Sequence, residues 1–477
     1  MNRSSGVLMH ISSLFGDYST GSFGKAAKYF ADFLYDCGFK YWQVLPFNMV
    51  DEHNSPYKSY SSFSGNPYFV DLEVLFEKGL ITKEELQGAK QESPWLCEFE
   101  RLAIERFSLL KKASERLDTK QKNAVKKFIS QNPYIASFCE FMARKDANCG
   151  KEWLEWDNDS YDKSVLFAWQ YIEYEFFTQW DEIKKYANDK GIKIIGDIPI
   201  YVSHDSSDVW SDTSQFRLDK DGRPTHVAGV PPDYFCQDGQ LWGNPLYDWK
   251  EMKKDGYKWW CDRIRHMAKL FDGVRIDHFR GIESYWAVPA SSKTAKDGKW
   301  VKGPGLSFIK AIKEAAGSSM IIAEDLGDIT PEVEKLVKDS GFPGMRVFQF
   351  AFLSDGESTH MPHNYPDNCI SYTGTHDNNT LLGYLWELDD NTRSRMLSYC
   401  GHTGDWKNGC ESIIRTMLSS HSSTVIMPIQ DILGFGADTR INTPGKAEGN
   451  WAYRITKEQL DSIDREHFKK LNKLYCR

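Results

Sequence analysis

The chain has 477 residues, of which 41% are hydrophobic and 26% charged, enough for one enzyme-sized core with added subdomains. Its 67 acidic and 59 basic residues give a formal net charge of -8, without a long run of like charges. This balance argues against a nucleic-acid-binding surface.

The first 30 residues contain only a short apolar patch, interrupted by His10 and followed by polar turns. This pattern is typical of a strand rather than of a signal peptide. No apolar window approaches the roughly 18 residues that a membrane span needs. The ten cysteines form no C-x-x-C pair and no zinc-ligand spacing, so we expect free thiols in a reducing cytoplasm.

The chain begins with a strand–helix–strand pattern. Residues 7–14 and 41–47 are apolar and predict strands, while residues 23–38 between them have helical periodicity and end in glycine. Such units build parallel sheets. Residues 72–163 are charged and helical and show no strand pattern, so they predict a helical insertion subdomain.

A second insertion follows the next strand. A helix at about 164–190 leads into an apolar strand at 193–202. Residues 204–249 are rich in Asp, Pro, Gly and aromatics and lack periodicity. Long connections of this kind are uncommon in compact domains and are more often functional. We therefore expect an irregular insertion over an active-site cleft.

From about residue 250 onward, helices and strands alternate. The predicted strands of the whole chain are 7–14, 41–47, 193–202, 273–279, 319–324, 345–352, 369–376 and 423–429. Eight strands with helices between most of them favour an α/β fold, a single (β/α)8 TIM barrel over residues 1–477, with the helical insertion between strands 2 and 3 and the irregular one between strands 3 and 4. A doubly wound open sheet is the alternative, although no Gly-rich phosphate turn follows the first strand.

Carboxylates gather at the ends of the predicted strands. The alternation in residues 273–279 turns Arg275 and Asp277 away from the apolar face. Glu324 and Asp377 end two later strands, and Asp197 lies in the third strand. The carboxyl ends of barrel strands meet at one mouth, so we expect these groups to lie together.

Such a cluster suits acid–base and nucleophilic chemistry. Repulsion between the carboxylates raises the pKa of at least one of them, while Arg275 stabilises the ionised form of Asp277. A retaining glycosidase needs this division between a protonated acid and an ionised nucleophile about 5–5.5 Å apart. Two alternatives stay open on this evidence: a structural ion pair between Arg275 and Asp277, and a metal site using Asp277, His278, His376 and Asp377.

Three strand-end motifs, RIDHF (275–279), AEDLG (323–327) and TGTHDN (373–378), resemble those of the α-amylase clan. The chain more closely resembles the amylomaltases, the 4-α-glucanotransferases (disproportionating enzymes) of glycoside hydrolase family 77, in their short bacterial form. The further motifs that carry this resemblance are SLFGDYSTGSFG (13–24), SPYKSYSSFSGNPY (55–68), GDIPIYV (196–202), VAGVPPDYFCQDGQLWGNPLYDW (227–249) and RINTPG (440–445).

The resemblance implies that Asp277 is the nucleophile, Glu324 the general acid/base and Asp377 a stabiliser of the transition state. It also implies a set of substrate-binding or supporting residues: Arg275, His278, His376, Tyr57, Asp197, Asp233, Phe235, Trp242 and Asn244. For Asp197, a structural hydrogen bond at the strand end is the alternative.

The implied reaction transfers α-1,4-glucan segments between maltooligosaccharides through a covalent glycosyl-enzyme intermediate, with glucose or a maltooligosaccharide as acceptor. No metal or organic cofactor is expected, because two carboxylates supply both the nucleophile and the proton transfer. No nucleic-acid or membrane partner is expected. The alternatives are a retaining α-glucan hydrolase with the same residues, a metal-dependent barrel hydrolase and a non-catalytic glucan-binding protein.

Overall fold

The computed structural model describes residues 3–232, 237–353, 357–446 and 448–477. Eight parallel strands form one sheet in the order β10-β11-β12-β1-β2-β3-β6-β9. The amide of Ala323 in β9 donates to the carbonyl of Pro343, just before β10, at 2.9 Å, and so joins the two edges. The predicted (β/α)8 barrel is therefore confirmed. The strands are β1 (Ser4–Leu8), β2 (Tyr41–Gln43), β3 (Lys193–Ile198), β6 (Gly273–Ile276), β9 (Met320–Ala323), β10 (Gly344–Val347), β11 (Cys369–Tyr372) and β12 (Thr424–Pro428).

Side chains of the barrel strands alternate between the interior and the outer face, as the two-residue period of a strand requires. The interior cluster includes Leu8, Ile195, Ile322, Met345, Val347, Ile370, Tyr372 and Ile426. The outward-facing strand residues Val7, Ile194, Val274, Ile276, Ile321 and Val425 belong to the core under the helices. On that outer face Gly196 permits close packing, since a Cβ there would lie 2.2 Å from the ring of Phe271.

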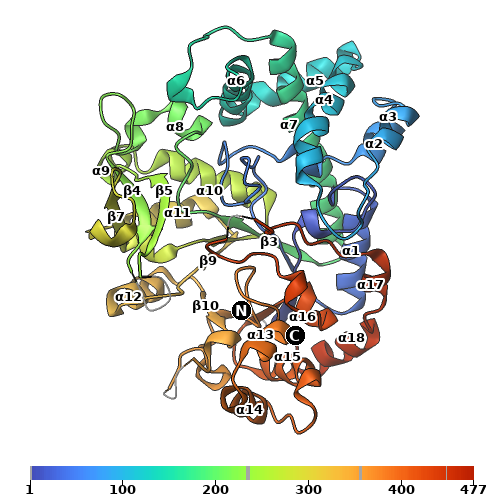
Figure 1. Ribbon diagram of the computed structural model, residues 1–477, viewed down its shortest axis with the longest axis vertical. Coiled ribbons are helices and arrows are strands. Elements are labelled where there is room, and N and C mark those ends of the chain that lie inside the picture. Colours follow the sequence, from blue (N-terminus) through green and yellow to red (C-terminus); the bar gives the residue numbers. More distant parts are fainter. Residues whose placement is uncertain (1–2, 233–236, 354–356, 447) are drawn as a thin grey trace.

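The helices that follow the strands cover the outside of the barrel (Figure 1). They are α1 (Lys25–Asp36), α7 (Lys163–Asp189), α9 (Trp249–Lys254), α10 (Lys258–Leu270), α11 (Gly305–Ala316), α12 (Pro331–Ser340), α13 (Leu381–Glu387), α14 (Asp390–Tyr399), α15 (Cys410–Ser419), α16 (Ile429–Leu433), α17 (Lys457–Asp461) and α18 (Arg465–Leu474). Between β10 and β11 the described residues contain only the short 3-10 helices η7 (Phe348–Phe350) and η8 (Pro362–Asn364).

The barrel strands are shorter than predicted. The prediction of strand over residues 345–352 is wrong beyond Val347, where the chain turns into η7. Likewise β1 ends at Leu8, and η1 (Ile11–Ser13) occupies part of the predicted strand 7–14. Apolar runs continue past the strand ends because the loops there are buried as well, and such a run does not separate strand from buried loop.

Helices fill most of the segment 72–163, and Figure 1 shows them along the top of the molecule. They are α2 (Leu72–Glu77), α3 (Lys83–Gly88), α4 (Phe99–Glu115), α5 (Thr119–Gln131) and α6 (Pro133–Ala147). Capping boxes begin two of them, with Thr82 paired to Glu85 and Asp118 paired to Gln121. The ring of Phe107 in α4 stacks on Trp169 in α7 at 4.8 Å, so this segment packs on the helix that precedes β3.

The prediction of irregular structure for residues 204–249 is wrong in part. This segment contains α8 (Ser207–Ser211), β4 (His226–Val230) and β5 (Gln240–Pro245). With β7 (Ser284–Pro289) and β8 (Lys299–Lys302), which the sequence did not predict, these strands form an antiparallel sheet in the order β5-β4-β7-β8 (left in Figure 1). The sheet was missed because its central pair, β4 and β7, forms across β6, and because residues 204–249 show no alternation in the sequence.

In the described part of the chain, no helix is both long and apolar enough to cross a bilayer. The described cysteines, all but Cys236, are free thiols, as predicted.

Candidate functional site

Arg275 organises one half of the barrel mouth. It points into the barrel from β6, and its Nη1 lies 2.6 Å from Asp197 Oδ2 while its Nη2 lies 2.8 Å from Asp277 Oδ1. Its Nε faces the sulfur of Met345 at 3.4 Å. Burial opposes the guanidinium charge, but Asp197 and Asp277 outweigh it and raise the pKa of Arg275 further above its ordinary value. Arg275 is thus a fixed cation between two carboxylates.

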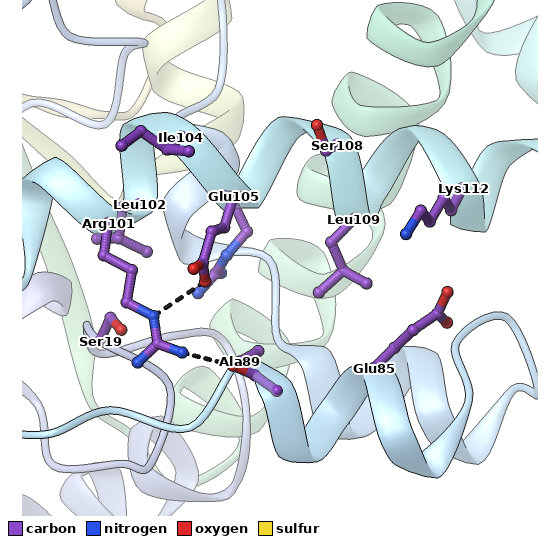
Figure 2. A pocket seen from close by; sticks show the side chains of 12 residues that line it. Ser19, Glu85, Ala89, Arg101, Leu102, Ile104, Glu105, Ser108, Leu109 and Lys112 are labelled. Atoms are coloured by element: carbon purple, nitrogen blue, oxygen red, sulfur yellow. Dashed lines mark hydrogen bonds and ion pairs between the residues drawn. The ribbon is translucent and has the colours of Figure 1, made fainter.

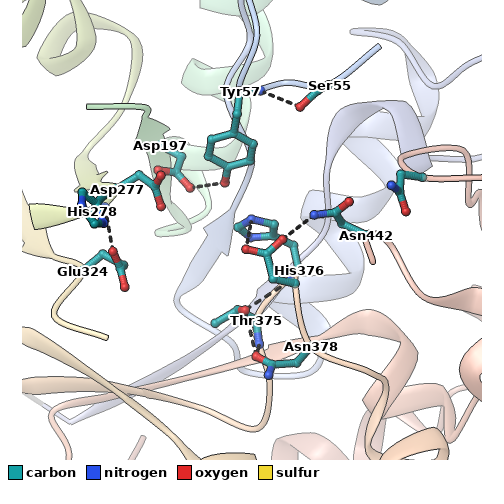
Figure 3. Close-up of polar contacts among 12 residues, drawn as sticks. Ser55, Tyr57, Asp197, Asp277, His278, Glu324, Thr375, His376, Asn378 and Asn442 are labelled. Carbon is teal, nitrogen blue, oxygen red and sulfur yellow. Dashed lines mark hydrogen bonds and ion pairs between the residues drawn. The ribbon is translucent and has the colours of Figure 1, made fainter. Parts of the chain in front are cut away.

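Asp197 is fully buried, and burial raises its pKa despite the charge of Arg275. Its Oδ2 accepts hydrogen bonds from Arg275 and, at 2.8 Å, from the hydroxyl of Tyr57. The ring of Tyr57 stacks on His376, with centroids 5.1 Å apart and planes at 16° (Figure 3). Its printed contacts with the rest of the site are those with Tyr57 and Arg275, and whether Asp197 serves the substrate or only the strand end stays a prediction.

Glu324 follows β9 and lies next to Asp277, because Ile276 and Ala323, the residues before them, are paired in the parallel sheet. Two backbone amides hold its carboxyl group: the amide of His278 donates to Oε2 at 2.7 Å, and that of Leu326 donates to Oε1 at 3.0 Å. Burial, followed by the charge of Asp277, raises the pKa of Glu324 to about 8. The group is therefore mostly protonated at neutral pH.

Asp377 lies beyond β11 and is half-buried. His376 Nε2 lies 3.3 Å from its Oδ2, and Asn442 donates to its Oδ1 at 2.6 Å. Burial acts to raise its pKa, but His376 and Asn442 together lower the pKa of Asp377 to about 2. Asp377 is accordingly a carboxylate at any working pH.

The antiparallel sheet reaches the same mouth. Trp242 in β5 packs edge-on against the His278 ring, with centroids 4.8 Å apart, and Asn244 donates from its side chain to the carbonyl of Val202 at 2.9 Å. His278 has a left-handed backbone (φ 49°), which turns its amide toward Glu324. Asp233 and Phe235, the other predicted residues of this segment, lie outside the described residues.

The contacts therefore form two groups, one in which Arg275 joins Asp197 and Asp277 and one in which the His278 amide joins Glu324. Figure 3 shows the second group, and it shows His376 beside Tyr57, which contacts Asp197. Sequence reasoning missed Asn442, and it missed Arg440, whose guanidinium donates to the Asp377 carbonyl at 2.6 Å. Both residues lie in the motif RINTPG, which is part of the family resemblance but to which the resemblance assigns no role. The two amide donors to Glu324 carry no side-chain signal that a sequence could reveal.

The metal-site alternative finds little support in the arrangement of ligand atoms. In the described ranges, one group of three His, Cys, Asp or Glu residues brings its ligand atoms within 4.8 Å of one another, namely Asp51, Glu52 and His53 on an outer loop. The strand-end carboxylates do not form such a group, and Arg275 lies between two of them.

A pocket of about 390 Å³ lies between α3 and α4, away from the strand ends (Figure 2). Its lining includes Arg101 and Glu105, whose Nε and Oε2 atoms are 2.9 Å apart. Arg101 also donates to the carbonyls of Gly88 and Lys90. The Arg101 guanidinium thus already has hydrogen-bond partners within the protein. None of the strand-end carboxylates lines the pocket.

Comparison with known proteins agrees with this geometry. Residues 9–460 match the glycoside hydrolase family 77 model, described as 4-alpha-glucanotransferase. A 4-alpha-glucanotransferase of Streptococcus pneumoniae serotype 4 is 44% identical over 493 residues, covering 100% of this chain and 97% of the relative. Another, from Clostridium butyricum, is 40% identical and covers 98% and 100%. A solved amylomaltase from Streptococcus agalactiae in complex with acarbose has a TM-score of 0.96 at 38% identity, covering 100% of this chain and 99% of that one. The chain therefore belongs to the 4-alpha-glucanotransferases of glycoside hydrolase family 77.

Proposed function

We propose that this chain transfers α-1,4-glucan segments between maltooligosaccharides by a retaining double displacement at the barrel mouth, with Asp277 as nucleophile and Glu324 as general acid/base. The observation that carries the proposal is the contrast between the two adjacent carboxyl groups. Asp277 accepts from a buried guanidinium, which stabilises a carboxylate, whereas Glu324 is buried among backbone amides with a pKa of about 8.

In the first step, Asp277 attacks the anomeric carbon of the donor while the glycosidic C–O bond breaks. Glu324 gives its proton to the leaving sugar oxygen, and a glycosyl ester with Asp277 results. In the second step, an acceptor hydroxyl attacks the same carbon, gives its proton to Glu324 and releases the carboxylate of Asp277. Two inversions at one carbon retain the α configuration.

For Asp377 we propose the role of stabilising the transition state. Its carboxylate, fixed by His376 and Asn442, favours the positive charge that develops on the sugar ring in the transition state. Tyr57, His376, His278, Trp242 and Asn244 are proposed to contact the glucan, and Asp233 and Phe235 stay predictions of the same kind. Aromatic rings beside polar groups are the usual components of a sugar-binding cleft.

Incubation with maltotriose tests the reaction type. Transfer predicts glucose plus a ladder of longer maltodextrins with little increase in total reducing ends, with glucose or a maltooligosaccharide as acceptor. A count of reducing ends that rises in step with substrate loss would mean hydrolysis. Activity should also survive EDTA, and its loss with rescue by a divalent ion would favour the metal-dependent alternative. A cytoplasmic location stays a prediction from the cysteine pattern.

A further inference from the structure

Arg280 has no part in the function proposed above, although it lies three residues after Asp277. It belongs to η5 (Phe279–Ile282) and is only 5% exposed. Its guanidinium carbon lies 3.8 Å from the ring centre of Trp300 in β8, and its Nη1 donates to the carbonyl of Asp328 at 2.6 Å. Arg280 thus connects the antiparallel sheet to the loop that follows β9.

That loop makes few other hydrogen bonds, although the Leu326 side chain packs against the interior cluster of the barrel. In the described part of the chain, the hydrogen bonds made by residues 326–329 are those of Leu326 with Glu324 and those of Asp328 with Arg280. The side chain of Asp328 is 74% exposed. Arg280 therefore fixes the outer end of a loop whose inner end is Glu324.

The two amides that hold the carboxyl of Glu324 come from the two segments that Arg280 joins. His278 lies two residues before Arg280, in a turn closed by the Gly281 amide and the His278 carbonyl at 3.0 Å. Leu326 lies two residues before Asp328 on the other side. The link between Arg280 and Asp328 thus bridges the two segments that carry these amides, which the Phe279 amide also joins directly by donating to the Glu324 carbonyl at 3.1 Å.

We propose that Arg280 is a positioning residue for the general acid/base, because its contacts with Trp300 and Asp328 keep the His278 and Leu326 amides on the two oxygens of Glu324. This inference rests on the role proposed for Glu324. A carboxylic acid held by two amides in one orientation can direct its proton at the leaving oxygen, whereas a loosely held one is misaligned for part of the time.

The charged groups that act on Glu324 are Arg275 from β6, Asp277 just after it and its own neighbour Asp325, and Asp325 is in turn paired with Arg346 from β10. Replacing Arg280 by Lys leaves all four in place and keeps the charge at position 280. Amide donors favour the ionised carboxylate, so loosening them makes Glu324 harder to ionise. The alkaline limb of the kcat/KM profile should then move to higher pH in Arg280→Lys.

The test compares two donors, because a good leaving group needs little help from an acid. On maltotriose we expect Arg280→Lys to lose about tenfold or more in kcat/KM, but less than about threefold with an α-glucosyl fluoride donor. Trp300→Leu, at a partly exposed position, should show the same donor dependence with a smaller loss. Glu324→Gln is the reference for complete loss of the acid.

Arg393 provides the matched control. It stacks on Trp406, with its guanidinium carbon 4.6 Å from the ring centre, and donates to the carbonyls of Leu385 and Leu388 at 3.0 Å each. This is the same kind of link, built on α14 rather than at the strand ends. Arg393→Lys should leave kcat/KM within about twofold of the wild type for both donors and should leave the pH profile unmoved.

Equal losses on both donors, or an unmoved alkaline limb in Arg280→Lys, would show that Arg280 only supports the fold and would overturn the inference. A similar donor-dependent loss in Arg393→Lys would overturn it as well. If the loss of kcat/KM in Glu324→Gln were as large with the fluoride donor as with maltotriose, Glu324 would not be the acid. That result would contradict the proposed function itself, and it can be told apart from a result in which only Arg280→Lys lacks the donor dependence.

Discussion

The ends of β6 and β9 lie side by side, and each carries a carboxyl group in a different setting. At the end of β6, Asp277 is about one-third exposed and accepts from a buried guanidinium at 2.8 Å. At the end of β9, Glu324 is buried, and it accepts from two backbone amides. The amides are neutral dipoles, so they orient the carboxyl group without supplying the full charge that would keep it ionised.

The difference teaches that two adjacent carboxyl groups can be given different surroundings, a cation for Asp277 and burial among neutral amides for Glu324. A cation within hydrogen-bond distance favours a carboxylate that can act as a nucleophile. Burial beside that carboxylate favours a protonated acid, and the pKa of Glu324 is accordingly raised to about 8. The following changes each alter one side of the comparison.

Asp277→Asn removes the nucleophile and should have the largest effect. We expect kcat/KM to fall by roughly 10⁴-fold or more on maltotriose, the range known for loss of an essential nucleophile. The loss should be as severe with an α-glucosyl fluoride, because an activated leaving group does not replace the attacking atom. Substantial turnover of the fluoride by this variant would contradict the role assigned to the β6 side.

Glu324→Gln alters the β9 side alone. It keeps the size of the side chain but cannot supply the proton, so the loss on maltotriose should be about 10²- to 10⁴-fold. With the fluoride donor the first step should remain fast and a glycosyl-enzyme should accumulate. The rate of the first step with the fluoride donor is measured by pre-steady-state release of fluoride. A loss as large as that on maltotriose would show that Glu324 is not the acid.

Arg275→Lys keeps a charge but loses the fork that holds Asp197 and Asp277 together. We expect a loss of roughly tens-fold in kcat/KM, because an ammonium cannot hold both carboxyl groups in the orientation that the guanidinium fixes. A near-normal kcat/KM would show that Arg275 only forms a structural ion pair at the strand end.

The smallest effect concerns stability. Glu324 binds its proton more tightly in the folded chain, with a pKa of about 8 against an ordinary 4.5, so the free energy of unfolding falls as pH rises between these values. Gln does not titrate. The Tm of Glu324→Gln relative to wild type should therefore increase from about pH 5 to about pH 8.5, reflecting on the order of a few kcal/mol. A difference independent of pH would contradict the raised pKa.

Much of the barrel could be predicted because its signals are local. The strand alternation around Arg275 and the helical periodicity of the segments between strands depend on neighbours in sequence, and they located Asp277, Glu324 and Asp377 at strand ends. The short strands β7 and β8 carried no such signal, since each is defined by its partners across the antiparallel sheet.

For the site, the sequence could predict which side chains take part but not the contacts that hold them. Asn442 reaches Asp377 across 65 residues of sequence, and the amides that hold Glu324 are backbone groups that every non-proline residue carries. The motif GDIPIYV likewise did not predict that Asp197 is buried, because a charged residue at a strand end can face either a ligand or a buried partner.

The most direct test of the central claim is to identify the residue that carries the sugar. Glu324→Gln is incubated with an activated α-glucosyl fluoride, quenched in acid, digested, and its peptides analysed by mass spectrometry. The proposed division of roles predicts one glycosyl unit as an ester on Asp277, and no label when Asp277→Asn is added to the variant. A label on Asp377 or on any other residue would contradict it.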